Sequence, residues 1–147
     1  MPIRIDSKLD SGKPGVSTVI RVYGRDFDVD TFVATCTLPV CTVKRRGEPV
    51  LAASQPDGRR HEQSGVHVLA SDADFTLFPA QVGDAIAFLR AHDVELRRLR
   101  TFAGVETATL DFGIERRDVA VQSDRLPAEL LRLAAALDLD IELSQYP

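Results

Sequence analysis

An amphipathic helix in the middle of the chain, with alternating segments before it, is the feature that most constrains the fold. From Phe78 to about His92, apolar residues recur at the i, i+4, i+7, i+8 and i+11 positions of one helical face. Val16–Tyr23 and Gly65–Ser71 alternate instead with the period of two that is typical of strands. Separate segments with these two periods predict a sheet that packs against helices.

Shorter patterns predict the other elements. Asp28 can cap a short helix from Val29 to about Thr35, because its carboxylate accepts backbone N–H bonds at a helix start. Val105–Ile114 and Asp118–Gln122 alternate on either side of a charged turn, which predicts a hairpin. We also expect strands at Val40–Lys44 and Ile141–Ser144, and helices at Val94–Phe102 and from Pro127 to near Leu137.

The order of these elements is βαββ, two helices and then ββαβ. The two flanking units resemble each other, because each places strands around one helix. We therefore predict an α+β fold, with a mainly antiparallel sheet from two βαβ-like units and helices packed on one face. Apolar residues make up 44% of the 147 residues, enough for one core. We expect 1–15 to be a flexible N-terminal segment and 16–147 to be a single α+β domain.

Composition and charge exclude several classes of protein. The first 15 residues lack the apolar run of a signal peptide, and charges interrupt every apolar stretch well before the roughly 18 residues of a membrane span. We therefore expect a cytoplasmic protein without a membrane segment. The net charge is −4, and without a basic footprint no nucleic-acid partner is expected.

Cys36, Cys41, His61 and His67 are the only set of side chains that suggests a metal site. Structural zinc sites pair ligands about two to four residues apart on tight turns, and these spacings differ. Buried free cysteines usually pack as small apolar groups. The sequence therefore predicts no metal and no cofactor.

The aspartates after the first strand, Asp26, Asp28 and Asp30, form a D-x-D-x-D run. A calcium loop starting there would need Gly at its sixth position and Glu at its twelfth, where the chain has Thr31 and Thr37. The histidines have no nucleophile elbow beside them in the sequence. We therefore predict no catalytic residues and interpret the aspartates as helix-capping and turn residues.

A long polar loop follows the second predicted strand, from Arg45 to Ser64. Loops longer than about 15 residues inside a compact domain are usually functional or disordered, and the sequence leaves both outcomes open. If the loop is functional, basic side chains around an apolar tip are typical anchors of an interface. The predicted partner-binding residues are Lys44, Arg45, Arg46, Val50, Leu51, Arg59 and Arg60.

Short motifs along the chain resemble a bacterial family, domain of unknown function 4279. These motifs are Tyr23-Gly24, Asp28-Val29-Asp30, Leu38-Pro39, the run from Val43 to Glu48, Ser64-Gly65, and the closing Leu-rich helix and strand. The resemblance would extend from about Ser17 to Tyr146. It implies that Gly47 is the family's characteristic glycine, with a backbone turn as its role. Some similar proteins are immunity partners of secreted antibacterial toxins.

The leading hypothesis is therefore a non-catalytic binding protein of the immunity type, which would block a cognate toxin by covering its active site. A second hypothesis is a small-ligand or regulatory module in which the two α/β units frame a cleft. A third is an enzyme with an unfamiliar site, in which His61 or His67 works with Asp26 or Asp28. The sequence leaves the oligomeric state open.

Overall fold

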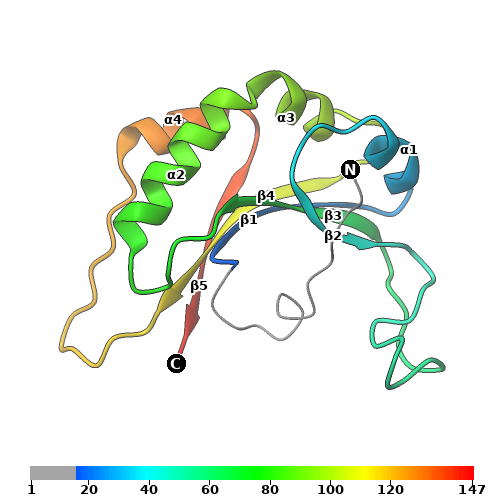
Figure 1. The fold of residues 1–147 in the computed structure, drawn as a ribbon, viewed down its shortest axis with the longest axis horizontal. Helices are drawn as coiled ribbons and strands as arrows, with labels where there is room; N and C mark the ends of the chain where they lie inside the picture. Colours follow the sequence, from blue (N-terminus) through cyan, green and yellow to red (C-terminus); the bar gives the residue numbers. More distant parts are fainter. Residues whose placement is uncertain (1–15) are drawn as a thin grey trace.

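The computed structural model describes residues 16–147 and contains one mixed five-stranded sheet and four helices (Figure 1). The strands lie in the order β2-β3-β1-β4-β5. The predicted α+β class is therefore confirmed. In chain order the elements are β1 (Thr18–Gly24), α1 (Val29–Ala34), β2 (Val40–Lys44), β3 (Ser64–Ser71), α2 (Phe78–Ala91), α3 (Asp93–Arg100), β4 (Thr107–Glu115), α4 (Ala128–Ala136) and β5 (Asp140–Tyr146).

The sheet is antiparallel except at one edge. β1 pairs antiparallel with β3 and β4, and β2 pairs antiparallel with β3. β5 runs parallel to β4, because α4 carries the chain back along the helical side before β5 begins. Of the two expected units, only β4-α4-β5 is a βαβ unit with adjacent strands, since β3 lies between β1 and β2.

The hairpin predicted from Val105–Ile114 and Asp118–Gln122 is wrong. β4 ends at Glu115, and residues 116–127 form a loop. The two edges of β4 are already occupied by β1 and β5, so a strand after β4 has no free place beside it. Within the loop Gln122 Nε2 donates to the Glu115 carbonyl over 2.9 Å, while Val121 stays 77% exposed.

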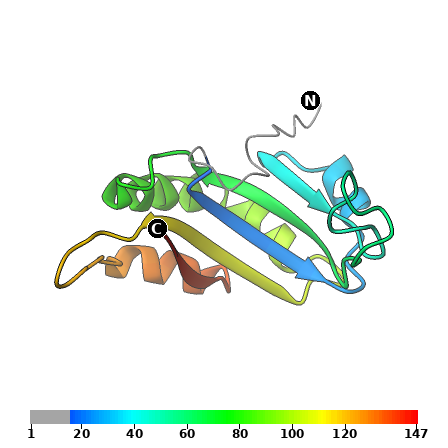
Figure 2. The same ribbon diagram turned by 90° about the horizontal axis from the view of Figure 1, so that it is seen from below.

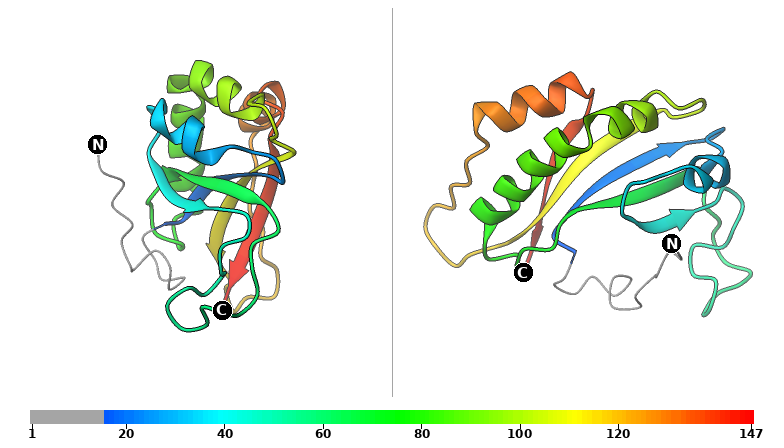
Figure 3. Two further views of the ribbon diagram at one scale, coloured as in Figure 1. Left: turned by 90° about the vertical axis from the view of Figure 1, so that its right-hand side faces the viewer. Right: turned by 45° about the horizontal axis from the view of Figure 1, so that its top comes forward.

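All four helices cover the same face of the sheet (Figures 1 and 3). Alternate residues of the central strands point into this interface, among them Ile20, Val68 and Phe112, each fully buried. Complete burial of such a side chain contributes about 1.5–3 kcal/mol of transfer free energy. None of the helices in residues 16–147 covers the other face, which Figure 2 presents to the viewer. We call this surface the open face.

Capping and turn residues in the sequence correctly predicted the ends of several elements. The Asp28 carboxylate accepts the Thr31 backbone N–H over 3.1 Å at the start of α1, as predicted. α4 begins directly after Pro127. Gly47 has a φ of +86°, which favours glycine, so the expected backbone turn at this position is confirmed.

The loop between β2 and β3, residues 45–63, is held by its own backbone hydrogen bonds. The Val50 N–H donates to the Arg59 carbonyl over 2.8 Å, and the His61 N–H donates to the Glu48 carbonyl over 2.9 Å. The loop extends from one end of the sheet toward the side away from the helices (Figures 1 and 3). It therefore forms a raised margin beside the open face.

A helix that crosses a membrane needs a long apolar stretch, and none of the helices in residues 16–147 has one.

Candidate binding site on the open face of the sheet

The open face carries polar and aromatic side chains from the centre of the sheet. Ile20 and Val22 point toward the helices, so the alternation of β1 directs Arg21 and Tyr23 to the opposite face. Arg21 stands directly opposite His67 of β3 in the antiparallel register. The sheet thus brings together side chains that are more than 40 residues apart in the sequence.

Tyr23, His67 and Lys44 form a chain of polar contacts on this face. The Tyr23 hydroxyl lies 2.5 Å from Nε2 of His67, and Lys44 Nζ donates to the Tyr23 oxygen over 3.4 Å. Burial, together with the positive charges of Lys44 and Arg21, lowers the pKa of His67 to about 3. The imidazole is therefore neutral near pH 7. Tyr23 and His67 thus share one short hydrogen bond, in which the imidazole tautomer sets which of the two groups donates.

Two glycines allow the aromatic rings of this face to lie close to the sheet. Gly65 is opposite Tyr23, and a Cβ atom on it would lie only 2.2 Å from Cδ1 of the tyrosine ring. A Cβ atom on Gly113 would lie 3.2 Å from Cζ of Phe75. Each ring thus occupies space that a larger residue would fill, and Gly65 places the Tyr23 hydroxyl within reach of His67.

A charged cluster crosses β1, β4 and β5 on the same face. Arg21 forms an ion pair with Glu142, and its Nε lies 3.6 Å from Oδ2 of Asp111. The other oxygen of Asp111 accepts a hydrogen bond from Ser144 Oγ over 2.7 Å. Among residues 16–147, Nε of Arg21 has no hydrogen-bond partner although it is buried, so its contact with Asp111 is electrostatic. The cluster holds the Arg21 side chain across three strands.

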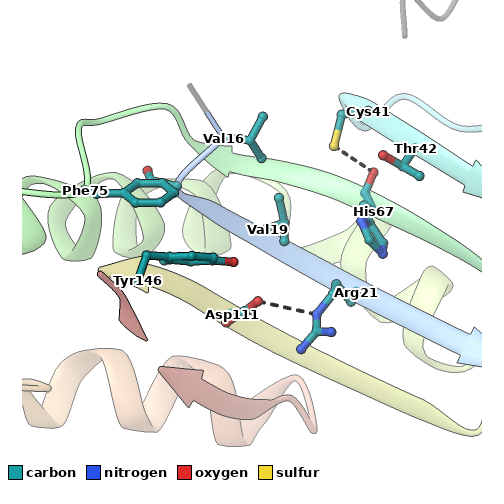
Figure 4. A pocket seen from close by; sticks show the side chains of 11 residues that line it. Val16, Val19, Arg21, Cys41, Thr42, His67, Phe75, Asp111 and Tyr146 are labelled. Atoms are coloured by element: carbon teal, nitrogen blue, oxygen red, sulfur yellow. Dashed lines mark hydrogen bonds and ion pairs between the residues drawn. The ribbon is translucent and has the colours of Figure 1, made fainter. Parts of the chain in front are cut away.

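A cavity of about 240 Å³ opens between these groups (Figure 4). At one end the Phe75 and Tyr146 rings pack together, with centroids 5.1 Å apart and planes inclined by 33°. At the other end lie Arg21 and His67. The lining residues are Val16, Ser17, Val19, Arg21, Cys41, Thr42, His67, Phe75, Asp111, Gly113 and Tyr146. This open-face cavity combines apolar rings with a few fixed polar groups, as ligand sites commonly do.

The cysteines contribute little reactive chemistry. Burial raises the pKa of both the Cys36 and the Cys41 thiol, which keeps them protonated near pH 7. Cys41 Sγ donates to the His67 carbonyl over 3.5 Å. No group of three or more His, Cys, Asp or Glu side chains within residues 16–147 could hold a metal ion. The contacts described on the open face are hydrogen bonds, ion pairs and ring packing.

The structure distributes the predicted partner-binding residues over several environments. Lys44 belongs to the open face through Tyr23. Arg45 pairs with Asp30 at 2.8 Å, and Arg46 lies 3.7 Å from Asp26. Arg60 donates to the Gly47 carbonyl and, with Val50 and Arg59, lines a second cavity, while Leu51 is 53% exposed.

The catalytic pairs considered for an enzyme do not form. Asp28 caps α1, and Asp26 faces Arg46. His67 bonds to Tyr23, and His61 lies in the loop beside the second cavity. Neither of these aspartates contacts either histidine among the described hydrogen bonds and ion pairs.

Sequence reasoning missed Arg21, Tyr23, Phe75, Asp111 and Tyr146 as site residues. The sequence contained a signal for two of them. Arg21 in β1 and Asp111 in β4 are charged residues, and their neighbours on either side in the strand are apolar. A charge in such a position indicates the face that helices do not cover.

Comparison with protein-family models, curated proteins and solved structures gave no match to this chain. The resemblance stated above therefore stays a prediction. The function has to be inferred from the open face itself.

Proposed function

We propose that the protein is a non-catalytic binding protein and that its ligand is a small molecule held in the open-face cavity. The observation that carries this proposal is the cavity of about 240 Å³, in which Arg21 and His67 converge with the Phe75–Tyr146 ring pair. A ring of the ligand can stack on the aromatic pair, while its polar atoms reach the fixed donors and acceptors.

The preorganisation of the polar groups supports this function. Burial and the charges of Lys44 and Arg21 keep His67 neutral, and Tyr23 orients its ring. Asp111 is oriented by Ser144. Side chains that are already held in place lose little conformational entropy when a ligand binds. The volume suits a small ligand, since the pockets that hold drug-sized molecules measure roughly 300–1,000 Å³.

The test is a screen of small polar aromatic molecules by two-dimensional amide NMR. Hits should shift amides around Val19, His67 and Asp111. The variant Val19→Trp would fill the cavity and abolish binding. Leu131→Trp on α4 is the matched control, because Leu131 is 45% exposed on the helical side. The natural chain contains no tryptophan, so each variant also carries a single fluorescent reporter of folding.

Two results would contradict the small-ligand proposal. Hits that bind Val19→Trp as tightly as the natural protein would place the site elsewhere. Hits that shift amides of α2 and α4 but none on the open face would do the same. Near-native emission and circular dichroism of Val19→Trp are required first, and a smaller replacement, Val19→Phe, serves if tryptophan impairs folding.

A protein partner of the immunity type is the second candidate. The loop of residues 45–63 favours it, since the loop projects beyond the sheet and exposes Leu51 and four arginines. Arginine is among the residues that most often carry the binding energy of an interface. In this function the charged loop would contact a toxin directly.

Replacing Arg45, Arg46, Arg59 and Arg60 together by Ala tests the second candidate. Capture of a cognate toxin should weaken by roughly tenfold or more, since charged anchors at an interface carry much of its affinity. The melting temperature should change little, because exposed ion pairs stabilise weakly. The control replaces four exposed arginines outside the loop, Arg90, Arg116, Arg125 and Arg132. Equal capture by both variants would exclude the loop as the interface.

A further inference from the structure

A second cavity, of about 300 Å³, lies where the 45–63 loop meets the end of the open face. Tyr23 and Lys44 come from the sheet, and Arg59, Arg60 and His61 come from the returning part of the loop. Backbone hydrogen bonds hold this part of the loop, including Val50 N–H to the Arg59 carbonyl and His61 N–H to the Glu48 carbonyl. We call it the basic cavity.

The basic cavity concentrates positive charge in a protein whose net charge is −4. Its lining contains three cationic side chains, Lys44, Arg59 and Arg60, and one carboxylate, Glu62. The local formal charge is therefore +3 − 1 = +2. Burial is the main cause that lowers the pKa of His61; the charges of Lys44 and Arg59 lower it as well, and the charge of Glu48 raises it.

Several hydrogen-bond donors remain available in the basic cavity. Arg60 uses one guanidinium nitrogen, NH1, to donate to the Gly47 carbonyl, which leaves its other N–H groups. Among residues 16–147, Lys44 Nζ donates one hydrogen bond, over 3.4 Å to the Tyr23 hydroxyl, and an ammonium group carries three hydrogens. Guanidinium groups bind the oxygens of phosphate in a bidentate manner, which a point charge does not.

We propose that the basic cavity binds a phosphate group. A phosphate monoester carries close to two negative charges near pH 7, and this charge matches the cavity better than the single charge of a carboxylate. The inference rests on the proposed binding function, because Tyr23 of the basic cavity bonds directly to His67 of the open-face cavity.

The experiment titrates the natural protein with inorganic phosphate, and separately with acetate, at constant ionic strength maintained with chloride. Phosphate should give saturable amide shifts at Lys44 and at residues 59–63. Acetate should give shifts at least several-fold weaker. Arg59→Gln should weaken phosphate binding by roughly tenfold or more, the usual effect of losing a charge-assisted hydrogen bond. Its matched control is Arg132→Gln, an exposed arginine on α4 with the same change in charge.

Three results would overturn the phosphate site. They are shifts that do not saturate, acetate binding as tight as phosphate binding, and equal losses of affinity in Arg59→Gln and Arg132→Gln. The experiments distinguish a failure of the phosphate site from a failure of the small-molecule ligand in the open-face cavity. Val19→Trp lies outside the basic cavity, so phosphate binding should survive in that variant while the small-molecule hits are lost. Hits in the open-face cavity without phosphate binding would leave the binding function intact and remove only this inference.

Discussion

His67 shows how the environment of one residue can set the acid stability of the protein. Its folded-state pKa is about 3, against 6.5 for an ordinary histidine. The unfolded chain therefore takes up a proton below about pH 6.5, while the folded protein does not until about pH 3. The contribution of His67 to the free energy of unfolding is therefore fully present above about pH 6.5. It is lost as the pH falls from about 6.5 to about 3.

We predict that the free energy of unfolding falls by on the order of 1 kcal/mol per pH unit between about pH 6 and pH 4.5. Urea unfolding at several pH values measures it. The variant His67→Gln should have a flatter profile in the same range, while the carboxylates, which titrate at lower pH, keep their own contribution. A profile of equal slope in both proteins would show that His67 is not buried as a neutral ring.

Gly65 is the residue on which the position of the Tyr23 ring depends. A Cβ atom there would lie 2.2 Å from the tyrosine ring and 2.7 Å from the Val22 carbonyl oxygen. Since the Val22 carbonyl oxygen belongs to the backbone, it cannot rotate away from the added Cβ atom. We predict that Gly65→Ala lowers the free energy of unfolding by about 1–3 kcal/mol, as overpacking does, and shifts the imidazole resonances of His67.

Gly83 provides the matched control for this substitution. It is exposed within α2, and an added Cβ atom would have no neighbour within 4 Å. Gly83→Ala should therefore stabilise the protein by up to about 1 kcal/mol through helix propensity. Chemical denaturation of both variants compares them directly, and equal effects would disprove the close contact at Gly65.

At the scale of elements, Gln81 joins α2 to two strands. This side chain is fully buried, accepts from Thr18 Oγ1 over 3.0 Å and donates to the Gly113 carbonyl over 2.9 Å. An amphipathic stripe predicts the helix but not a buried amide on its inner face. The contact depends on β1 and β4 lying side by side beneath α2.

We predict that Gln81→Leu lowers the free energy of unfolding by about 1–3 kcal/mol, because it leaves buried polar partners without hydrogen bonds. In the double variant with Thr18→Val, part of this loss should be recovered, since the hydroxyl group no longer lacks a partner. Urea unfolding of the four proteins gives the coupling energy. Additive effects would mean that Gln81 and Thr18 do not interact.

At the scale of the whole molecule, one buried cluster joins β1 and α1 near the start of the described chain to α4 near its end. Shared burial of this kind makes unfolding cooperative. The two tyrosines report on different ends of the open face, because Tyr23 lies beside Lys44 and Tyr146 packs on Phe75.

We predict that Tyr146→Phe and Tyr23→Phe each unfold in a single transition. Within each variant, fluorescence of the remaining tyrosine and far-ultraviolet circular dichroism should have the same midpoint. Tyr23→Phe lowers that midpoint by losing the bond to His67, but it should not separate the two signals. Separate midpoints in one variant would show that the two ends of the sheet unfold independently, contrary to a single domain over 16–147.

Local patterns in the sequence predict most of the helices and strands, the cap at Asp28, the start of α4 after Pro127 and the turn at Gly47. These features depend on side chains within a few residues of each other, so local periodicity and capping chemistry are sufficient to predict them. The sequence also predicted Lys44, Arg59 and Arg60 as members of a basic group, although not the cavity that they line.

The strand that lies beside β4 and the side chains that meet on the open face depend instead on long-range strand pairing. The segment Asp118–Gln122 alternates as a strand does, but pairing depends on a free edge, and β1 and β5 occupy both edges of β4. Arg21, His67 and Asp111 come from three strands whose register brings them together. A pattern along one segment contains no information about partners 40 or more residues away, which is why the site could not be found from the sequence alone.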